Sequence, residues 1–194
     1  EKRSETYDIV ISTVSPSSFI KLFGPKKEYI ERLKKIEFLG AYCFIVRLDR
    51  SISPYYWTSV NDPKAPFVAL VEHTNFIDKK RYDGSHIVYL GKYTKTDSRL
   101  FSLNEDQLWK LCFKYLKRID KKLKPKNILS RKLFKAPYAQ HIVDIKYKPL
   151  SYRTDKKGLL FAHFSQIYPH DRGTNYAIAQ AYELFNLISS RKWN

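Results

Sequence analysis

The sequence predicts an α+β protein in which a unit built on a mixed β-sheet is inserted between the two ends of another unit. Three observations predict this fold. Short apolar segments rich in β-branched and aromatic residues recur over residues 39–93, one long amphipathic helix follows them, and the chain closes with a short apolar strand, a polar turn and an apolar helix. We expect an outer unit formed by residues 1–36 and 155–194, and an inserted unit formed by residues 37–154.

The N-terminal part of the outer unit is predicted to hold one strand and one helix. Tyr7–Thr13 is a short apolar strand that ends before Pro16, because proline cannot donate to a strand ladder. Pro25–Ile36 is predicted to be a short amphipathic helix. The apolar residues on one face of this helix are Tyr29, Ile30, Leu33 and Ile36.

The inserted unit begins with three predicted strands. Leu39–Leu48 is the strongest of them, and Pro66–Thr74 and His86–Tyr93 follow it. A loop that carries three adjacent aromatic residues separates the first two strands, and these residues are Tyr55, Tyr56 and Trp57. If the second strand is regular to its end, Glu72 and Thr74 share one face, and His73 and Asn75 share the other.

A helix and a fourth strand complete the inserted unit. Ser102-Leu103-Asn104-Glu105 has the pattern of a capping box, and it predicts a helix that continues to about Leu123 and ends before Pro125. Asn127–Ala136 is predicted to be a strand that Pro137 breaks.

The chain is strongly basic, with 36 Lys and Arg residues against 19 Asp and Glu residues and a formal net charge of +17. The lysines are spread along the chain, which favours solvated faces, whereas a surface for nucleic acid or an anionic lipid stays the alternative. Cys43 and Cys112 lie within apolar stretches and are expected to be buried thiols of a reducing compartment. The spacing of Cys and His residues predicts no metal site, and no apolar run reaches the length of a membrane span.

The last forty residues carry the most specific pattern. A short apolar strand runs into the polar turn His163-Phe164-Ser165-Gln166, and Asp171-Arg172-Gly173-Thr174-Asn175 opens the final helix. Backbone N–H groups at a helix start are unpaired and carry the positive end of the helix dipole, so they suit an anion or a polarised carbonyl. Gly173 permits close approach of a ligand to the backbone, and the hydroxyl of Thr174 is expected to cap the helix.

This order of strand, turn and helix resembles the C-terminal flavin-contacting motif of the FAD-dependent amine oxidase superfamily, which includes protoporphyrinogen oxidases and carotenoid desaturases. The resemblance implies a Rossmann-like FAD-binding domain into which a substrate-binding domain is inserted. It also implies that FAD is the cofactor, and that the amides of Asn175 and Tyr176 face the flavin ring. The expected FAD contacts are Ser165, Gln166, Asp171, Arg172, Gly173, Thr174, Asn175 and Tyr176.

Two features of the sequence depart from the family pattern. The six glycines are too far apart to form the Gly-x-Gly-x-x-Gly turn that holds the FAD pyrophosphate. The sequence also contains no Met, which a complete translated chain would have at its start. We therefore expect a C-terminal part of a longer enzyme that needs a missing N-terminal FAD-binding part and is inactive alone. In addition, His163 and Phe164 stand where many relatives have Gly followed by an acidic or amide residue, so Ser165 or Gln166 would have to contact the ribityl chain.

The inserted unit supplies the candidates for catalysis and substrate binding. Val71-Glu72-His73-Thr74-Asn75-Phe76 and Ala136-Pro137-Tyr138-Ala139-Gln140 are similar to strings in the protoporphyrinogen-oxidase-like branch. His73 could act as a proton donor or orient a substrate, since its ordinary pKa lies near neutrality. The candidate catalytic residues are His73, Asn75 and Tyr138, and the candidate substrate contacts are Tyr55, Tyr56, Trp57, Glu72 and Gln140.

The resemblance implies an FAD-dependent oxidoreductase that oxidises or desaturates an apolar or ring-containing small molecule. Two alternatives stay open, a flavin-dependent sugar-nucleotide mutase and a basic module that binds nucleic acid or an anionic surface. No nucleophile motif such as Gly-x-Ser-x-Gly occurs. We expect a cytoplasmic protein without a specific nucleic-acid partner; peripheral attachment to a membrane and assembly into a homo-oligomer stay open.

Overall fold

The computed structural model describes residues 4–190 and divides them into two compact units. Unit 1 comprises the described residues up to Glu37 together with those from His141 onward, and unit 2 is Phe38–Gln140. The second boundary lies at residue 141 instead of the predicted residue 155. The reason is that the amide of Ile142 donates to the carbonyl of Glu37 at 2.9 Å, and Leu150 packs on the core of unit 1.

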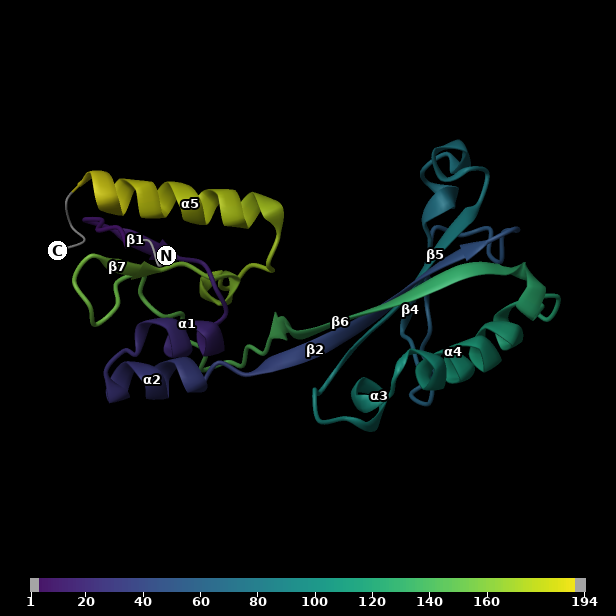
Figure 1. Ribbon diagram of the computed structural model, residues 1–194, viewed down its shortest axis with the longest axis horizontal. Coiled ribbons are helices and arrows are strands. Elements are labelled where there is room, and N and C mark those ends of the chain that lie inside the picture. The colour runs from purple at the N-terminus through teal and green to yellow at the C-terminus, as the bar shows by residue number, and fades with distance from the viewer. Residues whose placement is uncertain (1–3, 191–194) are drawn as a thin grey trace. The chain divides into compact units, whose positions relative to one another are not determined.

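Unit 1 has three layers (Figure 1). Strands β1 (Val10–Ser12) and β7 (Leu159–Phe161) pair in parallel and form the central layer. Helices α1 (Pro16–Phe23) and α2 (Lys27–Lys34) pack on one side of this pair through a core that includes Phe19, Leu33 and Phe161. The short turn η4 (Phe164–Gln166) follows β7, and α5 (Thr174–Ser189) lies along the other side of the pair.

Helix α1 was not predicted from the sequence, because Pro16 was interpreted only as the end of a strand. In the structure Pro16 occupies the first turn of the helix. Backbone N–H groups in the first turn have no acceptor within the helix, so the missing N–H of proline costs no hydrogen bond there. The hydroxyl of Ser15 accepts the amide of Ser18 at 3.3 Å and caps the helix start. Gly24 ends the helix with a left-handed φ of 49°. The proline therefore starts one element as well as ending another.

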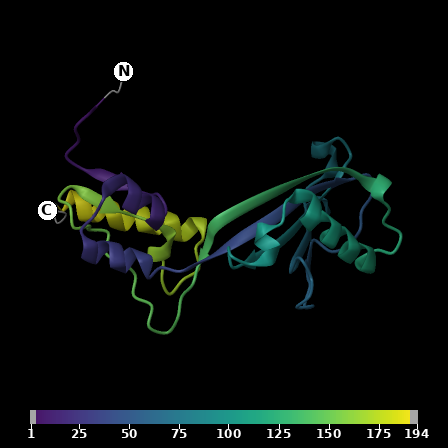
Figure 2. The same ribbon diagram turned by 60° about the horizontal axis from the view of Figure 1, so that its bottom comes forward.

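Unit 2 is built on a five-stranded sheet with the strand order β3-β4-β5-β2-β6. Its pairings β2–β5, β3–β4 and β4–β5 are antiparallel, whereas β1 and β7 of unit 1 pair in parallel. Figure 2 shows β2 and β6 running side by side for much of their length. The strands are β2 (Phe38–Leu48), β3 (Trp57–Ser59), β4 (Ala69–Glu72), β5 (His86–Thr94) and β6 (Ile128–His141).

One face of this sheet is covered by α3 (Arg99–Ser102) and α4 (Glu105–Ile119). Alternate residues of β2, such as Phe44 and Val46, are fully buried against Leu108 and Leu116 of α4. The predicted capping box of Ser102 and Glu105 is wrong, because Ser102 is the last residue of α3. The box of α4 lies two positions later, where Asn104 and Gln107 exchange the two bonds between side chain and backbone. The predicted α+β class is confirmed.

Two strand predictions in unit 2 need correction. β6 continues through Pro137 to His141, because β6 is an edge strand in which a missing N–H need not interrupt the ladder. β4 ends at Glu72, and His73–Asn75 form the 3-10 turn η1. The strand alternation expected for Glu72, His73, Thr74 and Asn75 is therefore wrong beyond Glu72.

Three further short elements complete the description. They are η2 (Lys79–Tyr82), η3 (Pro125–Asn127) and the isolated bridge between Arg153 and Leu160. Within residues 4–190 no helix combines the length and apolar character needed to cross a bilayer. Cys112 is a buried free thiol as expected, whereas Cys43 is a half-buried one on the sheet face opposite α4.

Candidate functional site

The polar turn after β7 is held by the side chain of Gln166. Its Oε1 accepts the amide of His163 at 2.7 Å, and its Nε2 donates to the carbonyls of Leu150 and Phe161, each at 3.1 Å. One amide side chain therefore connects the end of the strand, the turn and the incoming loop. Sequence reasoning singled out Gln166 but could not show these three bonds.

Inside the turn, His163 and Ser165 form a buried polar pair. Nδ1 of His163 lies 2.9 Å from Oγ of Ser165 and accepts the Ser165 amide at 3.2 Å. The Ser165 carbonyl also accepts a hydrogen bond from the hydroxyl of Tyr147. Because Ser165 is completely buried, its side chain holds the turn together in this structure.

Burial sets the charge state of the two histidines near this turn. Burial, followed by the nearby His141, lowers the pKa of His163 to about 4. Burial also lowers the pKa of His141, the charge of Arg172 lowers it further, and Asp171 partly opposes the shift. His163 is therefore neutral at pH 7, and since its Nδ1 accepts a hydrogen bond, the proton is on Nε2.

The start of α5 is not capped by a side chain. Gly173 is the N-cap residue, with a φ of −121°, and the first helical backbone bond runs from Ala177 to Gly173 at 3.0 Å. Thr174 occupies the first helical position, so the predicted Thr174 cap is wrong. The first turn also contains no acidic residue. The positive end of the helix dipole is consequently left without a carboxylate from its own first turn.

The residues just before the helix are arranged by contacts with rings. His170 stacks on Tyr176 with ring centroids 4.5 Å apart and an interplanar angle of 7°. The guanidinium carbon of Arg172 lies 5.9 Å from the centre of the Phe164 ring. The exposed carboxylate of Asp171 accepts the amide of Arg172 at 2.8 Å. These contacts involve three of the predicted residues, Asp171, Arg172 and Tyr176.

Two cavities lie against α5 in unit 1. The first, of about 320 Å³, is beside the helix start and is lined by Tyr152, Gln166, Tyr168, His170, Tyr176 and Glu183 among others. The second, of about 620 Å³, is mostly apolar and runs between β1, the turn and the helix. Among the predicted FAD contacts, Gln166 and Tyr176 line the smaller cavity. The contacts of all eight predicted residues with FAD stay predictions.

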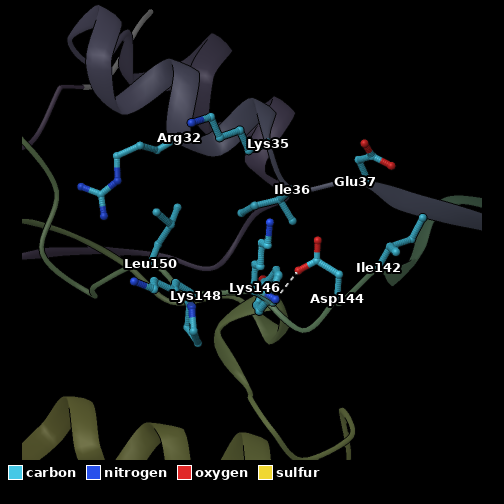
Figure 3. Close-up of a pocket in the computed structure, with 11 residues that line it drawn as sticks. Arg32, Lys35, Ile36, Glu37, Ile142, Asp144, Lys146, Lys148 and Leu150 are labelled. Carbon is cyan, nitrogen blue, oxygen red and sulfur yellow. Dashed lines mark hydrogen bonds between the residues drawn. The ribbon is translucent and has the colours of Figure 1, made fainter.

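A third cavity of unit 1, of about 520 Å³, is lined by basic side chains that the sequence analysis did not single out. Figure 3 shows Arg32 and Lys35 from the region of α2, and Lys146 and Lys148 from the loop after residue 141, around the same hollow. The carboxylates of Glu37 and Asp144 share this hollow, and Asp144 accepts the amide of Lys146 at 2.8 Å. Since these charged side chains are exposed, water screens them.

In unit 2, Glu72 anchors the loop that carries the aromatic residues. Glu72 is 0% exposed, and its Oε2 accepts the amides of Ile52 at 3.1 Å and Ser53 at 2.8 Å. Its Oε1 lies 3.3 Å from Nδ1 of His86. This position favours a structural role for Glu72, which the sequence analysis had placed among the substrate contacts.

The neighbouring candidates His73 and Asn75 are engaged in different ways. Nε2 of His73 lies 2.8 Å from the hydroxyl of Tyr82, and the His73 and Tyr89 rings pack nearly perpendicular to each other, with centroids 5.6 Å apart. Nδ2 of Asn75 donates to the carbonyls of Ser53 at 2.7 Å and Tyr55 at 3.1 Å. The structure therefore places Asn75 with Glu72 around one loop, and His73 beside two tyrosines.

The aromatic candidates of unit 2 are exposed. Tyr55, Tyr56 and Trp57 lie at the surface, where Tyr56 contacts Phe76 at 5.4 Å between ring centroids. Tyr138 lies on β6, at the opposite edge of the sheet from β3, and packs edge-to-face on Phe38. Gln140 is the last residue of unit 2. The structure thus separates Tyr138 and Gln140 from the loop candidates.

Sequence reasoning missed the sheet face opposite α4. The pairing register puts Trp57 beside Val71, Val71 beside Tyr89, and Tyr89 beside Ile45 on this face. Gly91 lies in the same layer, and a Cβ there would have no side chain within 4 Å. Strand alternation in β2 and β5 could have identified this second, partly open apolar face.

Comparison with known proteins shows the fold. No protein-family model matches the sequence, and no curated protein matches it. The solved structure of a "Putative protoporphyrinogen oxidase" from Exiguobacterium sp. 255-15 matches 95% of this chain with a TM-score of 0.72 and 12% identity. An oxidoreductase from Methanosarcina mazei matches 83% of this chain with a TM-score of 0.62 and 14% identity.

A third solved structure, that of a reduced UDP-galactopyranose mutase, matches 70% of this chain with a TM-score of 0.53 and 15% identity. The matched regions cover 41% of the Exiguobacterium protein, 38% of the Methanosarcina protein and 31% of the mutase. This chain therefore spans about two fifths or less of their lengths. At such low identity the likeness is structural, and it shows that the chain shares the fold of the corresponding part of these enzymes.

Proposed function

We propose that this chain forms the C-terminal part of an FAD-dependent oxidoreductase that acts on an apolar or ring-containing small molecule. The observation that carries the proposal is the structural likeness to an enzyme of that kind over 95% of the chain. The uncapped start of α5 supports it, because partial positive charge at a helix N-terminus stabilises an anionic group. The partly open sheet face of unit 2 supports an apolar substrate.

In this proposal FAD, when bound, supplies the hydride acceptor. The amides at the start of α5 would hold the polar edge of the cofactor, and Gln166 would keep the adjoining turn in place. His73 is the candidate for holding or moving a proton at its Nε2, where Tyr82 is now the partner. Asn75 would keep the aromatic loop in position through its bonds to Ser53 and Tyr55.

We also propose that the rest of an FAD-binding domain completes unit 1. A parallel pair of strands is normally buried on both faces, and two strands alone are marginal. Yet Ile11 of β1 is exposed, and so are Ile178, Tyr182 and Phe185 of α5. The bridge between Arg153 and Leu160 already lies at the outer side of β7, so the outer edge of β1 is the side that can receive another strand.

The intact protein tests the proposal. We expect it to carry stoichiometric flavin with a visible absorption band, and the 194-residue chain alone to bind FAD weakly or not at all. Gly173→Val in the intact protein should empty the site, because the added side chain would stand where the proposed cofactor approaches the backbone of the helix start. The new Cβ would also displace the side chain of Asn175, whose Oδ1 lies 2.5 Å from its position. Thr174→Ser is the matched control and should keep the flavin. Stoichiometric flavin in Gly173→Val would contradict the assignment.

A second candidate is a sugar-nucleotide mutase, which the likeness to UDP-galactopyranose mutase favours. The two reactions differ in whether electrons leave the substrate. An oxidoreductase consumes an electron acceptor in step with product, whereas an isomerase converts a nucleotide sugar without net consumption of an acceptor. Acceptor consumption by the intact protein with cyclic apolar amines or porphyrinogens, compared with turnover of UDP-galactopyranose, separates the two.

A further inference from the structure

A groove in unit 2 lies between helix α4 and the first residues of the edge strand β6. Its volume is about 580 Å³, and its floor is apolar, formed by Trp109, Phe113, Ile128 and Leu129. Lys110, Lys114 and Lys117 line it on the helix side. Figure 1 shows α4 beside this first part of β6. The groove thus joins an apolar floor to a basic wall.

The groove lies in the most basic segment of the chain. Residues 105–135 contain eleven basic and three acidic residues. Each of the three carboxylates is paired with an arginine, Glu105 and Asp106 with Arg131, and Asp120 with Arg50. Among the described residues, no carboxylate forms an ion pair with Lys110, Lys114 or Lys117. The positive charge of the wall is therefore not neutralised within unit 2.

The three lysines form a continuous row. They are spaced four and three residues apart on α4, and residues at these spacings lie next to one another on one side of a helix. The opposite side of α4 is fixed by the buried residues Leu108, Cys112 and Leu116. The helix therefore has no freedom to turn the lysine row away from the groove.

The strand side of the groove offers backbone groups. β6 ends the strand order β3-β4-β5-β2-β6, so no other strand of the described residues pairs with its outer edge. The amide of Leu133 donates to Oε2 of Glu105 at 3.2 Å. Along a strand, the backbone groups of every second residue point to the same edge, so part of the N–H and C=O groups of β6 face its outer edge. The outer edge of a strand is a template for pairing with another extended chain. On this edge strand the side chain of Leu129, which lines the groove, is exposed.

We propose that this groove binds an extended acidic peptide segment of a partner protein, which adds as a further strand to the edge of β6. Alternate apolar side chains of the peptide meet Trp109, Phe113 and Leu129, and its carboxylates meet the three lysines. The combination of an edge strand, a neighbouring helix and a groove between them is a known geometry for peptide recognition. Charge complementarity specifies the acidic character of the partner.

A polypeptide fits these observations better than an anionic membrane does. A bilayer is a broad surface that meets protruding charges, whereas the floor of this groove is recessed between a helix and a strand. Lipid headgroups also gain nothing from the open strand edge, because they cannot continue a ladder of backbone hydrogen bonds. Binding that depends on backbone N–H groups of the ligand is consequently the property that separates the two.

Fluorescence polarisation with the 194-residue chain tests the proposal. The probe is a fluorescein-labelled peptide of about ten residues that alternates glutamate with leucine. The matched probes are the same peptide with N-methylated backbone nitrogens at every second residue, in either register, and a peptide that alternates lysine with leucine. We expect the unmodified glutamate peptide to bind. The peptide that is N-methylated in one of the two registers, and the lysine peptide, should each bind at least about tenfold more weakly than the unmodified glutamate peptide.

Charge reversal on the wall provides the second arm of the test. Lys110→Glu combined with Lys114→Glu should weaken binding of the glutamate peptide by at least about tenfold. Lys79→Glu combined with Lys80→Glu, on the exposed turn η2, is the control with the same change in net charge, and it should weaken binding by less than about threefold. Circular dichroism of both variants checks that they fold.

Two results would overturn the proposal. One is equal affinity for the unmodified glutamate peptide and both N-methylated peptides, which would show that the peptide does not pair with β6 as a strand. The other is equal weakening by the two charge-reversed pairs, which would indicate a response to net charge alone. Binding to vesicles of phosphatidylserine with no measurable affinity for the glutamate peptide would assign the basic wall to a membrane surface instead. The arms that use the unmodified chain stay informative even where a variant fails to fold.

Discussion

Nδ1 of His163 lies 2.9 Å from Oγ of Ser165 inside the turn that precedes α5. The same nitrogen accepts the Ser165 amide, so the fold requires it to carry no proton. A neutral histidine is thus part of the structure of unit 1.

The stability of unit 1 should fall in acid because of this histidine. Its folded pKa of about 4 is below the ordinary value of 6.5, so the unfolded chain takes up the proton first. Stability should be constant above about pH 6.5, fall between about pH 6.5 and 4 by at most about 3 kcal/mol, and then level off. Hydrogen exchange of β7 amides at several pH values measures this loss.

His163→Asn is the control for this pH dependence. An asparagine oxygen can accept the Ser165 amide, yet it does not titrate. In the variant, the stability of unit 1 should depend much less on pH between about pH 6.5 and 4. A smaller loss of stability in acid should remain, because the lowered pKa of His141 acts in the same direction. An unchanged slope in the variant would show that His163 is not the group responsible.

Gln166 is expected to be the most important polar side chain of the turn. Gln166→Leu removes two donors and one acceptor, and it leaves the His163 amide and two carbonyls without that partner. We expect a loss of about 2–3 kcal/mol in the stability of unit 1, measured by hydrogen exchange of β7. Gln180→Leu removes the bond that Gln180 donates to the His163 carbonyl at 3.3 Å, and it should cost about 1 kcal/mol or less. Equal losses would contradict the special position of Gln166.

Glu72 should be equally important for unit 2. Glu72→Leu leaves the amides of Ile52 and Ser53 without their acceptor in a buried place. We expect a loss of about 3 kcal/mol or more in the free energy of unfolding of unit 2, and a smaller loss in Glu72→Gln, which keeps one acceptor oxygen. Urea unfolding followed by tryptophan fluorescence measures it. Asp97→Leu, at an exposed position, is the control and should change stability by about 0.5 kcal/mol or less.

The elements that local patterns define could be predicted from the sequence. Their aromatic and β-branched residues located β2 and β5 to within one residue, and the pattern of apolar residues located α4, although the capping residue is Asn104. Two of the errors occurred at prolines. Pro16 starts a helix that was missed, and Pro137 lies inside an edge strand. Whether a proline ends an element depends on neighbouring strands, which the local sequence does not specify.

The candidate site could be predicted only as a set of residues. Sequence order placed Gln166 and the segment 171–176 next to the start of α5, and the structure brings Gln166 and Tyr176 to one cavity. The sequence could not show that Ser165 is buried, or that Glu72 binds loop amides about twenty residues away. Such bonds depend on tertiary packing, which propensity and spacing do not encode.

Hydrogen exchange of the chain alone should reveal which elements are weakly protected because the proposed further polypeptide does not pack on them. Unit 2 has a large buried core, whereas β1 belongs to a two-stranded sheet and Leu184 is the buried residue of α5. Few buried contacts permit local opening at low free energy. We expect amides of β1 and α5 to exchange at least about a hundredfold faster than those of β2 and β5. Equal protection would show that unit 1 is complete without further polypeptide.

The exposed face of α5 provides the last test, because neighbouring residues on the helix differ sharply in burial. Tyr182 and Phe185 are 68% and 64% exposed, whereas Leu184 is 6% exposed. In the chain alone, Tyr182→Ser combined with Phe185→Ser should change the stability of unit 1 by about 0.5 kcal/mol or less, while Leu184→Ser should cost about 3 kcal/mol. If a missing FAD-binding part covers this face, the double variant of the intact protein should lose stability in thermal unfolding and release flavin. An intact protein unaffected by the double variant would place the partner of unit 1 elsewhere.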